Sequence, residues 1–247
     1  LTAGYAFLIF RQKIKSKTRR KAIVLRRVRK VFDGLHCCVG TALAVFAILC
    51  FVRVFRPQIY VPATVPATYK TSYTDAELLE MKTDFMRLTE SSWNTLTLQE
   101  KLNSLQVVAN LEQAYLGVPQ TLTVVAADME QRMCGYYRDS DWKIYMNKAH
   151  LETKSAETVL DTLCHEAYHA YQKRQVEVYC RVDERTRNLL MFRELESDFW
   201  ESIFYADAST NYTAYYTQGI ERDAREYAKK RVKVYERLVE QLQEEGE

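Results

Sequence analysis

The sequence predicts an α+β protein: a mostly helical domain with a small β-sheet, preceded by one transmembrane helix. Three observations lead to this prediction. Residues 35–52 form an uncharged segment that is long enough to cross a bilayer. Several later stretches carry apolar residues at helical spacing, and between them lie short runs rich in Val, Thr and Tyr. One of the helical stretches, 156–174, contains neither Gly nor Pro.

Charge is divided unevenly along the chain. Residues 11–30 hold eleven Lys or Arg and no acid, whereas residues 57–247 hold 22 Lys or Arg against 31 Asp or Glu. The net charge of +3 therefore describes neither part and gives no support for nucleic-acid binding. Residues 1–10 are apolar but too few to span a bilayer, and they match the end of an earlier span.

The uncharged segment is interpreted as the centre of a transmembrane helix over residues 35–55. As a helix its core is about 27 Å long, close to the roughly 30 Å hydrocarbon core of a bilayer. A long basic region precedes it, which disfavours a cleaved signal peptide. The positive-inside rule places the basic segment 1–34 in the cytoplasm. We therefore expect a single-pass protein of the cell membrane with an extracytoplasmic C-terminal domain.

Three of the four prolines follow, at Pro57, Pro62 and Pro66. With Val, Ala and Thr between them, they predict an extended, semi-rigid stalk over 56–72, ahead of a domain over 73–247.

The domain is expected to open with two capped helices. Thr74 is followed three residues later by Glu77, and the same spacing recurs at Thr97. In this capping box each side chain satisfies a backbone N–H of the other residue, so the pattern marks a helix start. We expect helices over 75–90 and 98–115.

Strands and further helices follow in order. Residues 121–127 are rich in Val and Thr and predict a strand, and residues 135–147 predict a hairpin with a polar turn. After the helix at 156–174, we expect helices over 184–206 and 211–243, the second broken near Gly219.

Six cysteines are divided in the same way as the charge. Three lie in the apolar segment, and the other three are Cys134, Cys164 and Cys180. Their spacing matches no cysteine zinc site, and three thiols allow at most one internal disulfide. We interpret these three as small buried thiols.

The helix over 156–174 carries His165-Glu166-Ala-Tyr-His169. Two histidines four residues apart lie on one helical face, so both imidazoles can bind the same zinc ion. Glu166 is placed to take a proton from a metal-bound water. Zinc lowers the pKa of that water from about 15.7 to about 7. The pattern indicates a zinc hydrolase, most often a peptidase.

A catalytic zinc site has three protein ligands and one open position. Glu221 is the strongest candidate for the third ligand, because Ala224 and Ala228 let its helix approach the motif helix closely. Glu196 and Glu226 are the alternatives. Most Glu side chains are solvated, so geometry must decide between the three.

HExxH followed by a Glu-x-x-Ala helix resembles the gluzincin type of zinc metallopeptidase, which is thermolysin-like in its ligand set. The ending Glu-x-x-Ala-x-x-Tyr-Ala is similar to that of ImmA/IrrE-type peptidases. The resemblance extends from Gly135 onward and implies a zincin-like domain. It implies His165, His169 and Glu221 as zinc ligands and Glu166 as the general base.

Two features depart from the family pattern. His169 and Glu221 are separated by 51 residues, a longer spacing than is usual in the compact members of this family. Arg225 stands where these families have an Asp, so the carboxylate that would orient a ligand histidine is assigned to Asp161 or Asp223.

The resemblance also implies two features of the cleft. The strand before the motif helix, here 143–147, would line the cleft and pair with an extended peptide. A hydrogen-bond donor would stabilise the oxyanion of the transition state. Tyr216 is our candidate for this donor, and the alternatives are Tyr212, Tyr215 and His150.

We therefore expect a membrane-anchored zinc metallopeptidase whose partners are a peptide or protein substrate and the lipid bilayer, without nucleic acid. One alternative is a membrane-tethered binding or scaffold module with a structural or inactive zinc site. The other is a peptidase of opposite topology that cuts a cytoplasmic regulator.

Overall fold

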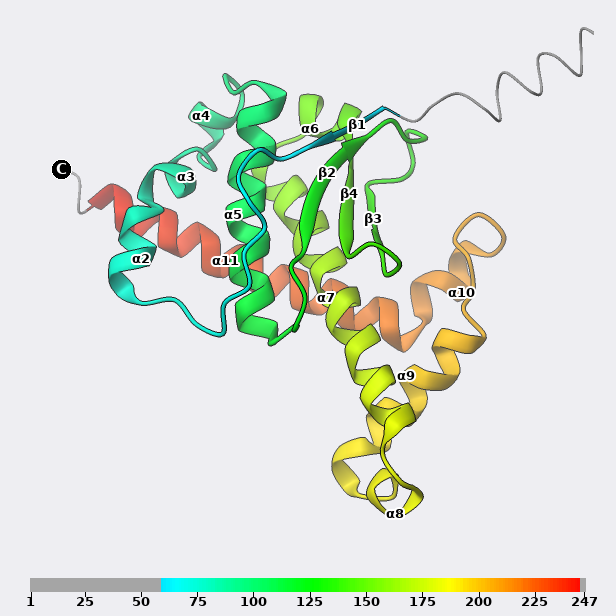
Figure 1. Ribbon diagram of the computed structural model, residues 1–247. Helices are drawn as coiled ribbons and strands as arrows, with labels where there is room; N and C mark the ends of the chain where they lie inside the picture. The colour runs from blue at the N-terminus through cyan, green and yellow to red at the C-terminus, as the bar shows by residue number, and fades with distance from the viewer. Residues whose placement is uncertain (1–58, 245–247) are drawn as a thin grey trace, which may run out of the picture. The chain divides into compact units, whose positions relative to one another are not determined.

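The computed structural model describes residues 59–244, and their mixture of helices with a small sheet confirms the α+β class (Figure 1). The basic segment 1–34 and the predicted transmembrane helix 35–55 lie outside these residues. Within 59–244, no helix is both long and apolar enough to cross a bilayer.

The sheet has four strands in the order β1-β2-β4-β3. Strands β2 and β4 are parallel, whereas β1 and β3 each pair antiparallel with their neighbour. The predicted strand and hairpin are therefore confirmed. The strands are β1 (Tyr60–Pro62), β2 (Thr123–Ala127), β3 (Gly135–Arg138) and β4 (Lys143–Asn147).

Helices make up most of the remaining chain. The two predicted capping boxes are present, and the break at Gly219 is confirmed. Two predicted helices are instead divided: the helix over 75–90 is interrupted at Met81, and the helix over 184–206 begins with a separate short helix that Asp183 caps and that ends at Arg187. The helices are α2 (Asp75–Glu80), α3 (Lys82–Met86), α4 (Glu90–Trp93), α5 (Leu98–Leu116), α6 (Lys148–Thr153), α7 (Ala156–Arg181), α8 (Glu184–Arg187), the 3₁₀ turn η1 (Leu190–Phe192), α9 (Arg193–Ile203), α10 (Tyr212–Thr217) and α11 (Gly219–Glu244).

The segment predicted as a stalk is part of the domain from residue 60 onward. β1 adds to the edge of the sheet beside β2. After it the chain stays extended along α5, where Asn103 Oδ1 accepts from the Thr64 N–H at 2.8 Å and Asn110 Oδ1 accepts from the Thr68 N–H at 3.1 Å. These side chains accept hydrogen bonds from backbone N–H groups that are not paired in the sheet. The composition predicted the extended conformation but not this contact.

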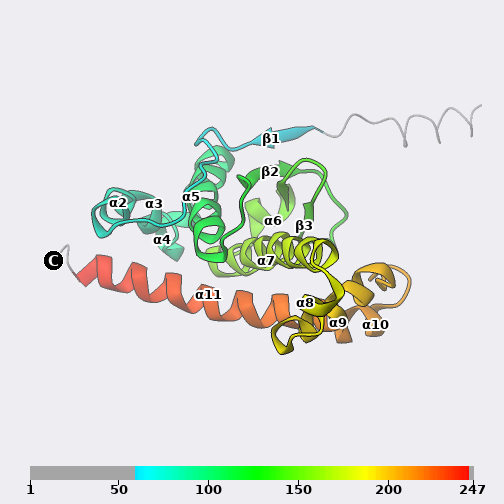
Figure 2. The same cartoon turned by 60° about the horizontal axis from the view of Figure 1, so that its bottom comes forward.

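Helix α7 lies between the sheet and α11. Ser155 caps its start by accepting a hydrogen bond from the Thr158 N–H. One side of α7 packs on β3 and β4 and another packs on α11, as Figure 2 shows. Ala224 and Ala228 of α11 have no exposed surface, and such small side chains are suited to close approach of two helices. This contact brings the start of α11 to the middle of α7.

The expectation of buried thiols is correct for Cys164 only. Cys134 and Cys180 are exposed, and all three are free thiols. Cys134 directly precedes the edge strand β3, and Cys180 lies in the last turn of α7, so neither faces the core.

A buried ion pair fixes α11 against α5. Glu112 has no exposed surface. Its carboxylate accepts from Arg231 Nε at 2.7 Å and from the hydroxyls of Tyr227 and Tyr235. All three donors belong to α11, so this single side chain sets how α11 lies along the core.

Glu112→Gln is expected to lower the free energy of unfolding by about 3 kcal/mol, because the largely buried Arg231 guanidinium loses its counter-charge. Urea denaturation would measure this loss. The matched control is Glu236→Gln, an exposed site on α11, where we expect a change within about 0.5 kcal/mol. Equal effects of the two substitutions would contradict the role given to Glu112.

Candidate metal centre

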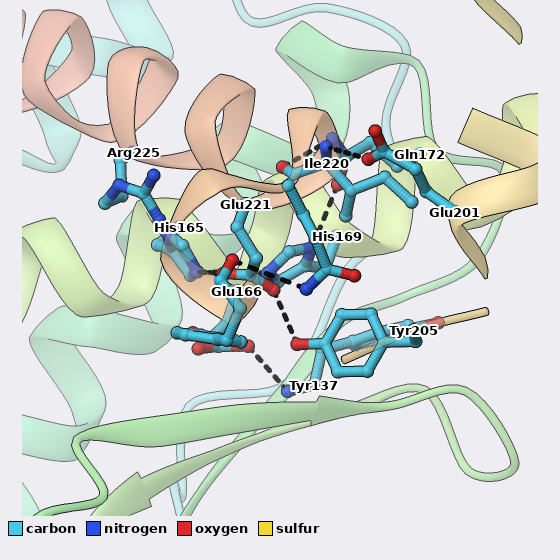
Figure 3. A network of polar contacts seen from close by, with 12 residues as sticks. Tyr137, His165, Glu166, His169, Gln172, Glu201, Tyr205, Ile220, Glu221 and Arg225 are labelled. Carbon is cyan, nitrogen blue, oxygen red and sulfur yellow. Dashed lines mark hydrogen bonds and ion pairs between the residues drawn. The ribbon is translucent and has the colours of Figure 1, made fainter. Parts of the chain in front are cut away.

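Two histidines of α7 and one glutamate of α11 converge at the contact between these helices (Figure 3). The Nε2 atoms of His165 and His169 are 3.0 Å apart. Glu221 Oε2 lies 3.3 Å from His165 Nε2, and Glu221 Oε1 lies 3.4 Å from His169 Nε2. The predicted trio therefore forms one group whose ligand atoms could hold a metal ion.

These separations fit tetrahedral coordination. Ligand atoms that each lie roughly 2.0–2.1 Å from a zinc ion are about 3.3 Å apart at tetrahedral angles. The Glu221 side chain is only 1% exposed, and its Oε2 is buried without a hydrogen-bond partner despite its closeness to His165. A buried polar atom of this kind calls for an explanation, and a bound cation supplies one. The residues present therefore fit a divalent metal.

Glu221 lies in the first turn of α11, and Glu201 of α9 helps to hold that turn. Glu201 Oε2 accepts a hydrogen bond from the Ile220 N–H at 2.8 Å. A Cβ atom at Gly219 would lie 3.1 Å from Glu201 Oε1, so a glycine gives the carboxylate room at the start of the helix. A carboxylate at this end also complements the helix dipole.

The trio is electrostatically coupled. Burial raises the pKa of Glu221, but the contact with His165 and the charge of His169 outweigh it and lower the pKa to about 2. Glu221 is therefore ionised at neutral pH. Burial lowers the pKa of His165, yet Glu221 and Glu166 together raise it. Because a ligand imidazole must be unprotonated, protons would compete with a metal ion at this residue.

Glu166 lies beside the trio and is buried. Its Oε2 accepts a hydrogen bond from the Tyr137 N–H at 2.8 Å. Tyr137 belongs to β3, and among residues 59–244 this strand pairs on one side only, with β4. The free edge of the sheet therefore faces the site.

This arrangement corrects the expectation for residues 143–147. Those residues form β4, which lies between β2 and β3, so both of its edges are already paired. The parallel pairing of β4 with β2 joins segments that are distant in sequence, and alternation along one strand does not reveal it. The strand with a free edge at the site is β3.

The expected oxyanion donors are scattered. The Tyr216 ring lies under the Arg225 guanidinium at 3.9 Å. Tyr212 is exposed and stacks on Tyr216. His150 Nε2 lies 3.0 Å from the backbone oxygen of Gln131.

Tyrosines nevertheless adjoin the trio. The Tyr205 hydroxyl donates to Glu221 Oε1 at 2.6 Å. Burial, followed by this hydrogen bond, raises the pKa of Tyr205, so the phenol stays protonated. Tyr215 is also near Glu221, and burial and the Glu221 charge raise its pKa. Of the tyrosines named from sequence, only Tyr215 is brought to the carboxylate.

The alternative ligands lie away from the trio. Glu196 and Glu226 are exposed on the surfaces of α9 and α11. Asp223, a candidate for orienting a ligand histidine, pairs with Arg222 at 2.9 Å. Asp161 lies near enough to His165 to contribute to its raised pKa, and within 59–244 no hydrogen bond joins the two side chains.

Two neighbours of the trio were missed by sequence reasoning. Gln172 Oε1 is 2.8 Å from His169 Nδ1, and Gln172 follows His169 by three residues on α7. This helical spacing is a signal that could have identified it. Tyr205 lies in the connection between α9 and α10, and no local pattern marks it.

Comparison of the chain with known protein families, with curated proteins and with solved structures gave no match in any of the three.

Proposed function

We propose that this chain is a membrane-anchored zinc metallopeptidase of the gluzincin type, with its catalytic domain outside the cytoplasm. The observation that carries the proposal is the convergence of His165, His169 and Glu221 at separations suited to zinc, with the Glu166 carboxylate beside them. Among residues 59–244 this group offers three ligands, the number that a catalytic zinc site takes, whereas a structural zinc site is closed by four protein ligands.

His165, His169 and Glu221 would hold the ion, and a bound zinc would supply an acidified water and polarise the peptide carbonyl. Glu166 takes a proton from the attacking water and passes it to the leaving amine. The Tyr137 N–H occupies Oε2 of Glu166, which leaves Oε1 for this proton. An extended substrate would pair with edge groups of β3 other than the Tyr137 N–H, which Glu166 already occupies.

A charge that develops on the carbonyl oxygen needs a donor nearby. Tyr205 and Tyr215 are the phenols closest to the metal ligands, and both keep their protons at neutral pH. We assign the donor to this pair in place of Tyr216.

Metal analysis and chelation test this proposal. The purified full chain is expected to contain about one zinc ion and to hydrolyse an unfolded protein such as casein. A chelator should abolish hydrolysis, and added zinc should restore it. A chain that binds zinc yet leaves such substrates intact would support the alternative of a tethered binding module. Protease accessibility of residues 59–244 on intact cells would test the orientation.

A further inference from the structure

Gln172 makes two hydrogen bonds that end on different parts of the metal centre (Figure 3). Its side chain is almost entirely buried, with 4% of the residue exposed. At one end, Oε1 is 2.8 Å from His169 Nδ1. At the other end, Nε2 donates to the Ile220 carbonyl oxygen at 3.0 Å. Ile220 immediately precedes the ligand Glu221.

Chemistry fixes the direction of both bonds. The Ile220 carbonyl can only accept, so the NH₂ end of Gln172 must face it. The amide oxygen then faces His169, and an oxygen can only accept a hydrogen bond from the ring. His169 Nδ1 therefore carries the proton, and Nε2 presents its lone pair toward His165 Nε2 and the Glu221 carboxylate. This is the tautomer that a metal ligand requires.

We propose that Gln172 is a positioning residue that joins His169 to the start of α11 through one amide group. The inference rests on the proposed function only in that the trio binds a metal. Glu201 holds the N–H of the same Ile220 from the other side but does not contact His169. Gln172 therefore links the ligand His169 on α7 to Ile220, the residue before the ligand Glu221 on α11, and among residues 59–244 no other side chain hydrogen-bonds to both.

The test measures zinc affinity of the full chain by competition with a fluorescent chelator, together with the melting temperature of the metal-free chain. Gln172→Leu removes both hydrogen bonds at similar volume. We expect zinc affinity to fall about 10–100-fold, as is usual when the partner of a ligand histidine is lost.

Gln172→Glu distinguishes two roles of Gln172: orienting the His169 ring and stabilising the start of α11. A carboxylate still accepts from His169 Nδ1–H, so we expect zinc affinity within about threefold of the original chain. The same carboxylate cannot donate to the Ile220 carbonyl, so the metal-free melting temperature should fall. Zinc affinity would then be retained while the melting temperature of the metal-free chain falls.

Gln175→Leu is the matched control. This residue also lies on α7, but its amide donates to the Tyr171 hydroxyl, away from the trio. We expect its zinc affinity to be unchanged.

The inference is overturned if Gln172→Leu binds zinc as tightly as the original chain, or if Gln172→Glu is as weak as Gln172→Leu. Failure of the proposed function looks different: zinc would bind with the expected dependence on Gln172 while no hydrolysis is detected.

Discussion

Glu166→Gln is expected to reduce peptide hydrolysis by about 10²–10⁴-fold, the usual contribution of a positioned general base. The amide has the shape of the carboxylate but cannot take a proton from water. Its side-chain oxygen can still accept from the Tyr137 N–H, so the fold and the zinc content should be retained. Steady-state hydrolysis of a fluorogenic peptide, with zinc content measured on the same sample, provides the test.

Glu157→Gln is the control, because Glu157 is an exposed residue of the same helix. Its activity should match that of the original chain. Full activity in Glu166→Gln would remove Glu166 from the role of base, and the hydrolytic mechanism would then need another proton acceptor.

Glu221→Ala is expected to weaken zinc binding by more than about 10²-fold. Structural zinc sites with four ligands bind with roughly 10–16 kcal/mol, so one ligand accounts for about 2.5–4 kcal/mol, which corresponds to roughly 10²–10³-fold in affinity. The substitution also removes the acceptor of the Tyr205 hydroxyl and the carboxylate that lies against both histidines. Competition titration with a chelator measures the affinity.

Glu226→Ala is the matched control on α11, since Glu226 is exposed. It should bind zinc normally. Normal zinc binding by Glu221→Ala would contradict the assignment of Glu221 as the third ligand.

Sequence alone predicted the features that depend on local spacing. The capping boxes at Thr74 and Thr97 form as expected, because both partners lie within one helical turn. The histidines of α7 share a face for the same reason. The structure also brings Glu221 to the two histidines, as predicted. That prediction joined two distant segments and was based on the small residues along α11.

Features that depend on tertiary contacts were missed. Tyr205 reaches Glu221 from a connection whose path no periodicity describes. The segment after β1 was interpreted as a stalk. The sequence of α5 carries a signal against that interpretation, a recurring row of amide side chains. Asn103, Gln106, Asn110 and Gln113 all hydrogen-bond to backbone atoms of other segments. Such a row on a buried helix indicates that extended backbone lies against it.

The buried pairing of Glu112 with Arg231 holds the helices around the proposed metal site together without help from an ion. In small zinc-folded modules the ion creates the tertiary structure, so its removal unfolds the polypeptide. Here α5, α7 and α11 are locked together by a hydrophobic core and this ion pair, independently of the two imidazoles. Demetallated protein would therefore keep its architecture, and reloading would require no refolding.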